Sequence, residues 1–186
     1  SYNNFYGVNL YSSFDNDLTN NTVNNNNNIG VYLEDSSNND LINNIANNNY
    51  DVGFNLDGSS NNDLINNTAI NNNNHGIKLS YSSENNYLNL NTLINSQVGI
   101  NLHHYSDNNN ISFNIIKNTS YSGIWVSDTS NITIYNNTLN INNISSNGIY
   151  LSECLDTVLK LNLINKSGYG IKGFQTHNSE FISNSI

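Results

Sequence analysis

Hydrophobic residues return along this chain at a nearly fixed interval. Each unit opens with a glycine, which is followed by an apolar, a polar and a second apolar residue, as in GVYL at residues 30–33. Two apolar residues separated by one polar residue predict a short strand with one buried face. The opening glycines stand at positions 7, 30, 53, 76, 99, 123, 148 and 170, with spacings of 23, 23, 23, 23, 24, 25 and 22 residues. A period this regular predicts a solenoid.

Two further apolar positions in each unit predict a second and a third strand. In the unit that opens at Gly30 they are Leu41 and Ala46. The equivalents of Leu41 are Leu18, Leu64, Leu88, Ile111, Ile134, Leu159 and Phe181, and those of Ala46 are Val23, Ala69, Leu93, Ile116, Leu139, Ile164 and Ile186. The pattern therefore predicts about eight turns of about 23 residues with three short strands per turn.

Two repeat architectures have a period near 23 residues. A leucine-rich repeat needs a spaced leucine motif and a helical or extended convex side, but the corresponding segments here are rich in Asn, Ser and Thr, which are mediocre helix formers. A parallel β-helix needs only short strands, polar corners and side-chain ladders. We therefore predict an all-β fold, a right-handed parallel β-helix that occupies residues 1–186 as a single domain.

One asparagine recurs between the second and third strands of every unit. An inward amide at this position can bond to its counterparts in the turns above and below, about 4.8 Å away, as in an asparagine ladder. Alignment of the column requires one extra residue in the units that open at Gly76 and Gly99. The predicted ladder consists of Asn21, Asn44, Asn67, Asn91, Asn114, Asn137, Asn162 and Asn184.

Two weaker columns lie at the corner before the second strand. One contains Asn16, Asn39, Asn62, Asn86 and Asn109. The other contains the small residues Ser13, Ser36, Ser59, Ser82, Thr129, Cys154 and Thr176, with Tyr105 as the exception. We expect this second column to form a tight bend, and Cys154 to be a small core residue.

Composition narrows the possible partners. The chain has 49 Asn among its 186 residues, no Arg, five Lys and a formal charge of −9. Nucleic acid and anionic membrane surfaces both require a basic patch, so neither is an expected partner. No apolar run approaches the ~20 residues of a membrane span. The chain begins and ends within the repeat pattern, so we expect it to be part of a longer protein with flanking repeats.

The motif G-[IVF]-x-[LV]-x-x-S…N-x-L-x-x-N, as in GVYLEDSSNNDLINN and GIYLSECLDTVLKLN, resembles the repeats of the NosD-like group in the pectate-lyase-like superfamily. The resemblance covers essentially the whole chain and implies the parallel β-helix fold. Such repeats occur in polysaccharide lyases and epimerases, in a periplasmic protein of copper-site maturation, and in adhesin-like and surface-layer proteins. The resemblance therefore does not choose among these activities.

Any binding chemistry must use outward positions, because the inward ones form the core. On the first strand, the residue between the two buried aliphatics is Trp125 in one unit and Tyr150 in the next. Aromatic faces flanked by carboxylates suit stacking on a sugar ring with hydrogen bonds to its hydroxyls. The alternative is that these are ordinary exposed strand residues. The candidate ligand-binding residues are Trp125, Tyr150, Asp128, Glu153, His103 and Lys78.

Catalysis is not expected. A uronate lyase or epimerase must stabilise a carboxylate and abstract a neighbouring proton, but the chain has no arginine, and Lys78 and Lys172 are four units apart. A glycosidase needs a pair of acids, for which Asp128 and Glu153 are the nearest candidates.

No cofactor is required by the pattern, although Ca²⁺ has a candidate position. Asp17, Asp40 and Asp63 occupy one outward column, where a bridging cation would relieve the repulsion between like charges. The alternative is a row of solvated acids that discourages lateral aggregation. His103 and His104 are adjacent on an extended segment and are expected to point to opposite sides, which favours structural roles over metal binding.

The function expected from the sequence is that of a structural or adhesive repeat segment in an extracellular, cell-surface protein. In this interpretation the β-helix is a rigid spacer with a possible polysaccharide contact. The alternative is a carbohydrate-binding or carbohydrate-processing module of the lyase, epimerase or hydrolase kind.

Overall fold

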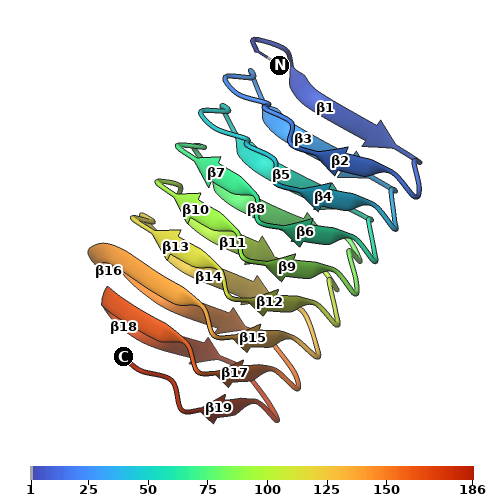
Figure 1. Ribbon diagram of the computed structural model, residues 1–186. Coiled ribbons are helices and arrows are strands. Elements are labelled where there is room, and N and C mark those ends of the chain that lie inside the picture. The colour runs from blue at the N-terminus through green and yellow to red at the C-terminus, as the bar shows by residue number, and fades with distance from the viewer. Residues whose placement is uncertain (1) are drawn as a thin grey trace.

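The computed structural model describes residues 2–186 and is a parallel β-solenoid of stacked turns (Figure 1). We number the turns 1 to 8 by their opening glycines, from Gly7 to Gly170. Strands of successive turns lie side by side and pair in parallel, so each turn contacts mainly the turn before it and the turn after it. The described residues contain strands, isolated bridges and bends but no helix.

The first strands of the turns form one continuous sheet. It runs from β1 at the N-terminal end to β18 at the C-terminal end, and Val8, Val31 and Phe54 show its register. Its first strands are β1 (Tyr6–Tyr11), β3 (Ile29–Glu34), β5 (Val52–Asp57), β8 (His75–Ser80), β11 (Val98–Leu102), β14 (Ser122–Ser127), β16 (Thr138–Ser152) and β18 (Leu163–Phe174). Through the long β16, the same 11-stranded sheet continues into the third strands of the turns.

The second strands form a separate sheet of eight short strands. Each has the predicted apolar residue at its centre, which is aliphatic in seven strands and Phe181 in β19. The strands are β2 (Asp17–Thr19), β4 (Asp40–Ile42), β6 (Asp63–Ile65), β9 (Tyr87–Asn89), β12 (Asn110–Ser112), β15 (Thr133–Tyr135), β17 (Val158–Lys160) and β19 (Glu180–Ile182).

The third strand is complete only in turns 3 to 7. It is β7 (Thr68–Ile70), β10 (Thr92–Ile94), β13 (Ile115–Lys117) and then the first parts of β16 and β18, which continue around the corner into the next turn. Turns 1 and 2 have isolated bridges instead, at Thr22 and Ile45. The prediction of three strands per turn is therefore confirmed for the middle of the solenoid, while the first two turns have a looser third side.

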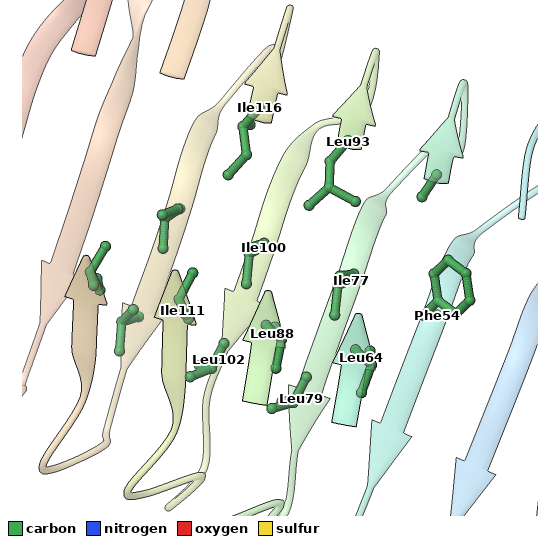
Figure 2. Packing of buried hydrophobic residues seen from close by; sticks show 14 of the residues in the cluster. Phe54, Leu64, Ile77, Leu79, Leu88, Leu93, Ile100, Leu102, Ile111 and Ile116 are labelled. Atoms are coloured by element: carbon green, nitrogen blue, oxygen red, sulfur yellow. The ribbon is translucent and has the colours of Figure 1, made fainter. Parts of the chain in front are cut away.

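The core is the space enclosed by the three sides of each turn. Figure 2 shows Phe54, Ile77 and Ile100 from the first strands directed toward the side chains of the other two sides. Phe54, Leu64, Ile77 and Leu93 are all fully buried. Aliphatic side chains from equivalent positions thus stack in columns along the solenoid axis.

The opening glycines are required by close backbone approach between turns. A Cβ placed on Gly76 would lie 2.7 Å from the carbonyl oxygen of Gly99 and 3.2 Å from Leu93 Cβ. The other opening glycines of turns 1 to 7 face the next glycine carbonyl in the same way, at 2.4–2.7 Å. Only a residue without a Cβ fits there, which explains why the sequence returns a glycine at each turn.

The predicted asparagine ladder is present in all eight turns. Asn44 donates from its backbone N–H and from Nδ2 to Oδ1 of Asn67, at 2.8 and 3.1 Å, and Nδ2 also donates to the Leu18 carbonyl at 2.6 Å. The same pair of bonds joins each ladder residue to the next as far as Asn184. Every link points the same way: donors face the C-terminal end and acceptors face the N-terminal end.

Two further asparagine columns support other corners. The weaker column predicted from the sequence is a ladder between Asn16, Asn39 and Asn62. A third ladder was not predicted: Asn26 bonds to Asn49 at 2.9 Å, and Asn49 bonds to Asn72 at 3.1 Å. It lies at the corner between the third strand and the next first strand, within runs of Asn where no single position stands out.

The small-residue corner differs from its prediction in turns 4 and 5. Ser59 donates its N–H to Ser83 Oγ at 3.0 Å, so the inward position is Ser83 and not Ser82. In the next turn the inward residue is Ser106, which is fully buried, whereas Tyr105 is 70% exposed. The extra residue of these two turns lies in this corner, where two consecutive residues take positive φ instead of one. The column of small residues is thus unbroken and has no aromatic exception.

Candidate functional site

One outward column runs along the whole first-strand sheet. Each member lies between two inward apolar residues, except that Gly173 replaces the second apolar residue in turn 8. The strand registers place the members directly beside one another. We call it the outward column. From turn 1 to turn 8 it contains Asn9, Tyr32, Asn55, Lys78, Asn101, Trp125, Tyr150 and Lys172.

The predicted aromatic pair is stacked. The rings of Trp125 and Tyr150 have centroids 6.1 Å apart and planes inclined by 20°. Lys172 Nζ lies 5.1 Å from the centre of the Tyr150 ring, and Tyr121 packs against Trp125 at 5.2 Å. The C-terminal half of the outward column is therefore an ordered aromatic surface with a cation at its end.

A hollow of about 260 Å³ lies beside Trp125. Three of the six candidate residues line this hollow: Trp125, His103 and Asp128. Its other lining residues are Asn101, His104 and Ser127. The longer corner of turn 5 forms one wall, because the extra residue there carries the two histidines outward.

Two of the residues that line this hollow each carry a buried polar atom with no hydrogen-bond partner within the protein. These atoms are the acceptor Oδ1 of Asn101 and the donor Nε1 of Trp125. Asn101 is only 6% exposed, because the long side chains of Lys78 and Trp125 lie on either side of it in the column. A buried amide or indole group without a partner is unfavourable, so each such group needs an explanation. A ligand hydroxyl suits both, since it accepts from an N–H and donates to a carbonyl oxygen.

The expectation that His103 and His104 point to opposite sides is wrong. Their rings are 4.4 Å apart and their Nδ1 atoms lie within hydrogen-bonding distance of each other. The cause is the backbone at His104, which has a φ of 54° and turns the chain instead of extending it. Tyr81, which belongs to the preceding turn, stacks on His104 with ring centroids 5.0 Å apart.

The surroundings of His103 and His75 favour the neutral form of both side chains, because they lower the pKa of each. Burial lowers the pKa of His103 to about 4, and the nearby charges of Lys78 and the other histidines act in the same direction. Burial followed by the charge of Lys78 also lowers the pKa of His75 to about 4. At neutral pH His103 therefore contributes an uncharged imidazole to the lining of the hollow.

The other candidate residues lie near the hollow but not in it. Glu153 follows Asp128 by one turn, both have positive φ at the same corner, and the adjoining residues Ser127 and Ser152 are paired. Lys78 lies two turns before Trp125 in the outward column, on the other side of Asn101. The structure thus places all six candidates on one face, with Lys78 and Glu153 at its margins.

The aspartate column lies on a different face. Asp17, Asp40 and Asp63 are paired in register at the first positions of β2, β4 and β6, as predicted. Burial, and then the charge of Asp40, raises the pKa of Asp63. Among residues 2–186, no three His, Cys, Asp or Glu side chains are grouped so as to hold a metal ion. The proposed Ca²⁺ bridge therefore gains no support from the geometry.

Two other hollows lie at the corner between the third and first strands. One, of about 340 Å³, is lined by Asn28, Tyr50, Asp51, Asn73, Asn74 and Gln97. The other, of about 350 Å³, is lined by Asn118, Thr119, Ser120, Ile141, Asn142 and Asn143. Neither is flanked by a stacked aromatic pair.

No helix in the described part of the chain is long and apolar enough to cross a membrane.

Family models match the chain along its whole length. The model described as "Right handed beta helix region" matches residues 1–116, and the model described as "Periplasmic copper-binding protein (NosD)" matches residues 62–186. No curated protein matches the chain.

Solved structures share the fold. A double mutant of the periplasmic alginate epimerase AlgG is 19% identical, with a TM-score of 0.79 over 97% of this chain and 48% of that chain. The A-module of the mannuronan C-5 epimerase AlgE4 of Azotobacter vinelandii is 17% identical, with a TM-score of 0.74 over 93% and 55%. The catalytic domain of an α-1,3-glucanase in complex with nigerose is 15% identical, with a TM-score of 0.56 over 90% and 47%. This chain spans about half the length of these structures.

Proposed function

Because this chain belongs to the right-handed β-helix family that includes the NosD repeats, we propose that it is a rigid segment of a periplasmic or extracellular protein that binds polysaccharide along its outward column. The family description and the AlgG structure both name periplasmic proteins, which supports a location outside the cytoplasm. The spacer role rests on the uninterrupted ladder and core, which make one stiff rod of stacked turns.

The observation that carries the binding proposal is the pair of unpartnered groups at the hollow. Asn101 Oδ1 and Trp125 Nε1 offer an acceptor and a donor beside the stacked rings of Trp125 and Tyr150. Sugars present hydroxyls at the ring edge and C–H groups on the ring face, so one pyranose uses both features at once. Two of the matching solved structures are epimerases of alginate and mannuronan, and a third is a glucanase in complex with nigerose.

We propose binding without turnover. Epimerisation or elimination at a uronate requires a group that stabilises the carboxylate while a base removes a proton. The hollow has no Lys or Arg in its lining, and a carboxylate ligand would face the carboxyl group of Asp128. Copper binding is not part of the proposal, because residues 2–186 contain no group of three metal-ligating side chains and the chain has no methionine.

The test is direct binding of soluble polysaccharides by calorimetry, with Trp125→Ala as the main variant. A stacked aromatic at the centre of a site contributes about 2 kcal/mol or more, so most of the affinity should be lost. Phe113→Ala is the matched control, because Phe113 is an exposed aromatic at the end of β12 in the other sheet. Absence of binding to any glycan, or equal affinities for the wild type and Trp125→Ala, would contradict the proposal. Product formation from a bound glycan would replace it with a processing function.

A further inference from the structure

A second asparagine in the outward column repeats the environment of Asn101. Asn55 in β5 is also 6% exposed, and its Oδ1 is also buried without a hydrogen-bond partner. The two residues share a cause: each is a short side chain between two long ones. Asn55 lies between Tyr32 and Lys78, as Asn101 lies between Lys78 and Trp125.

The two sites are separated by two turns. Lys78 is the column member between them, and both neighbouring strand pairs are in unbroken parallel register. Adjacent strands lie about 4.8 Å apart, so Asn55 and Asn101 repeat at about 9.6 Å along the solenoid axis. Between them the column changes from amide to cation and back to amide.

This alternation sets a requirement on the ligand. A pyranose chain advances along its axis by an interval similar to one turn of the solenoid. In an extended chain with a two-fold screw, consecutive sugars are turned over, so every second sugar presents the same edge. A hydroxyl that reaches Asn101 then recurs, two sugars further along, opposite Asn55.

We propose that Asn55 is a second sugar subsite and that the ligand is a linear, extended glycan with two-fold symmetry. It would occupy the five column positions from Asn55 to Tyr150, with its aromatic contacts at Trp125 and Tyr150 and its amide contacts at Asn101 and Asn55. This inference rests on the proposed function and extends it by naming the shape of the ligand and a subsite distant from the hollow.

The environment of Asn55 favours a binding role over a structural one. The fold does not use its side-chain oxygen, whereas every inward ladder asparagine bonds to the next turn. Leucine at this position would remove an unpartnered polar group and keep the branched shape of the side chain. Asn55→Leu should therefore unfold at the same temperature as the wild type or at a higher one, while it loses the subsite.

The experiment compares oligosaccharides of three and six sugars. The probes are β-1,4-linked glucose, N-acetylglucosamine and mannuronate, which form extended chains, and β-1,3-linked glucose, whose chain winds. In the best-binding β-1,4 series, the six-sugar ligand should bind the wild type about tenfold more tightly than the three-sugar ligand. Asn55→Leu should remove this gain and leave three-sugar binding unchanged, whereas Trp125→Ala should weaken both. Asn73→Leu, an exposed asparagine on another corner, should change neither affinity.

Three outcomes would overturn the inference. They are equal affinity of the two lengths for the wild type, a length gain that survives in Asn55→Leu, and an equal gain in the β-1,3 series. If these occur while Trp125→Ala still abolishes binding, the proposed function stands and only the second subsite is wrong. If no probe binds the wild type at either length, the proposed function and the subsite both fail.

Discussion

Asn114 donates from its backbone N–H and from Nδ2 to the single oxygen Oδ1 of Asn137, at 2.9 and 3.0 Å. The same Nδ2 donates to the Leu88 carbonyl of the preceding turn at 2.9 Å. Asn91 in turn donates to Asn114 Oδ1. The Asn114 side chain thus links its own turn to the turn before it and the turn after it. Asn114 and Asn137 are both buried.

Replacing a ladder asparagine should destabilise the protein strongly. In Asn114→Leu or Asn67→Leu, the two donors of the preceding turn lose their acceptor, while the acceptor of the next turn keeps only the backbone N–H and loses the Nδ2 donor. Each stranded buried group costs about 1–3 kcal/mol. We expect the free energy of unfolding to fall by at least about 2 kcal/mol. Asn73→Leu is the control, because Asn73 is exposed. Chemical denaturation that gives the ladder variants and the control the same midpoint would show that the ladder contributes little.

The opening glycines should be equally intolerant of a methyl group. In Gly76→Ala the new Cβ would lie 2.7 Å from a backbone carbonyl, that of Gly99, which has no room to move. Overpacking of this kind costs about 1–3 kcal/mol. Gly173→Ala should be much milder, because the nearest atom there is the Thr176 Oγ1 at 3.1 Å. Thermal unfolding of the two variants compares them directly, and similar losses would show that close approach is not the reason for the glycines.

Stability should depend on pH through His75. Its pKa in the folded protein is about 4, against an ordinary value of 6.5, so the unfolded chain binds more protons between these values. The contribution of His75 to stability is therefore complete above pH 6.5 and is lost as the pH falls toward about 4. Lys78 strengthens the depression, whereas Asp51 opposes it.

Unfolding midpoints of the wild type and His75→Gln, measured between pH 7.5 and pH 4.5, isolate this effect. The wild type should lose more stability than the variant over this range, because glutamine does not titrate. Parallel curves for the two proteins would show that His75 is protonated as easily in the folded state as in the unfolded chain.

The ends of this 186-residue polypeptide should associate. β1 and β19 each have an unpaired edge, and Phe5, Phe181 and Ile186 are between 50% and 74% exposed. Exposed strand edges and apolar surface favour pairing with another chain. Light scattering should show a mass that increases with protein concentration. A constant monomer mass, together with slow hydrogen exchange in the terminal turns, would contradict this prediction.

The sequence predicted the architecture because each structural role is filled by the same residue type at the same interval. The column of Asn44 and Asn67 was visible from its spacing alone. The inward small residue of turn 4 was predicted to be Ser82 but is Ser83. Turns 4 and 5 each contain one extra residue, and the sequence does not show at which position it was inserted. The backbone shows it, because the corner there has two residues of positive φ instead of one. The ladder from Asn26 to Asn72 was missed because almost every nearby residue is also Asn.

The candidate site was predicted less completely than the fold. Trp125 and Tyr150 were identified because aromatic residues at outward positions of successive turns must lie together. Asn55 and Asn101 were not identified from the sequence. Their burial depends on how the side chains of Tyr32, Lys78 and Trp125 extend over them from neighbouring turns. The position of His104 depended on a local turn that the pattern of an extended strand does not reveal.

The one-way direction of the asparagine ladder bears on how such a protein can change its length. Every turn offers the same acceptor to the turn before it and the same donors to the turn after it, so removal of residues 76–98 would bring together two turns that fit each other as the originals did. Duplication of a turn would likewise create no unmatched junction inside the ladder. Insertions and deletions of whole repeats should therefore keep the ladder matched. An event between Asn55 and Asn101 would also move these two outward amides relative to each other by one step. Gain or loss of a repeat between Asn55 and Asn101 would thus alter ligand selection without changing a single side chain at either position.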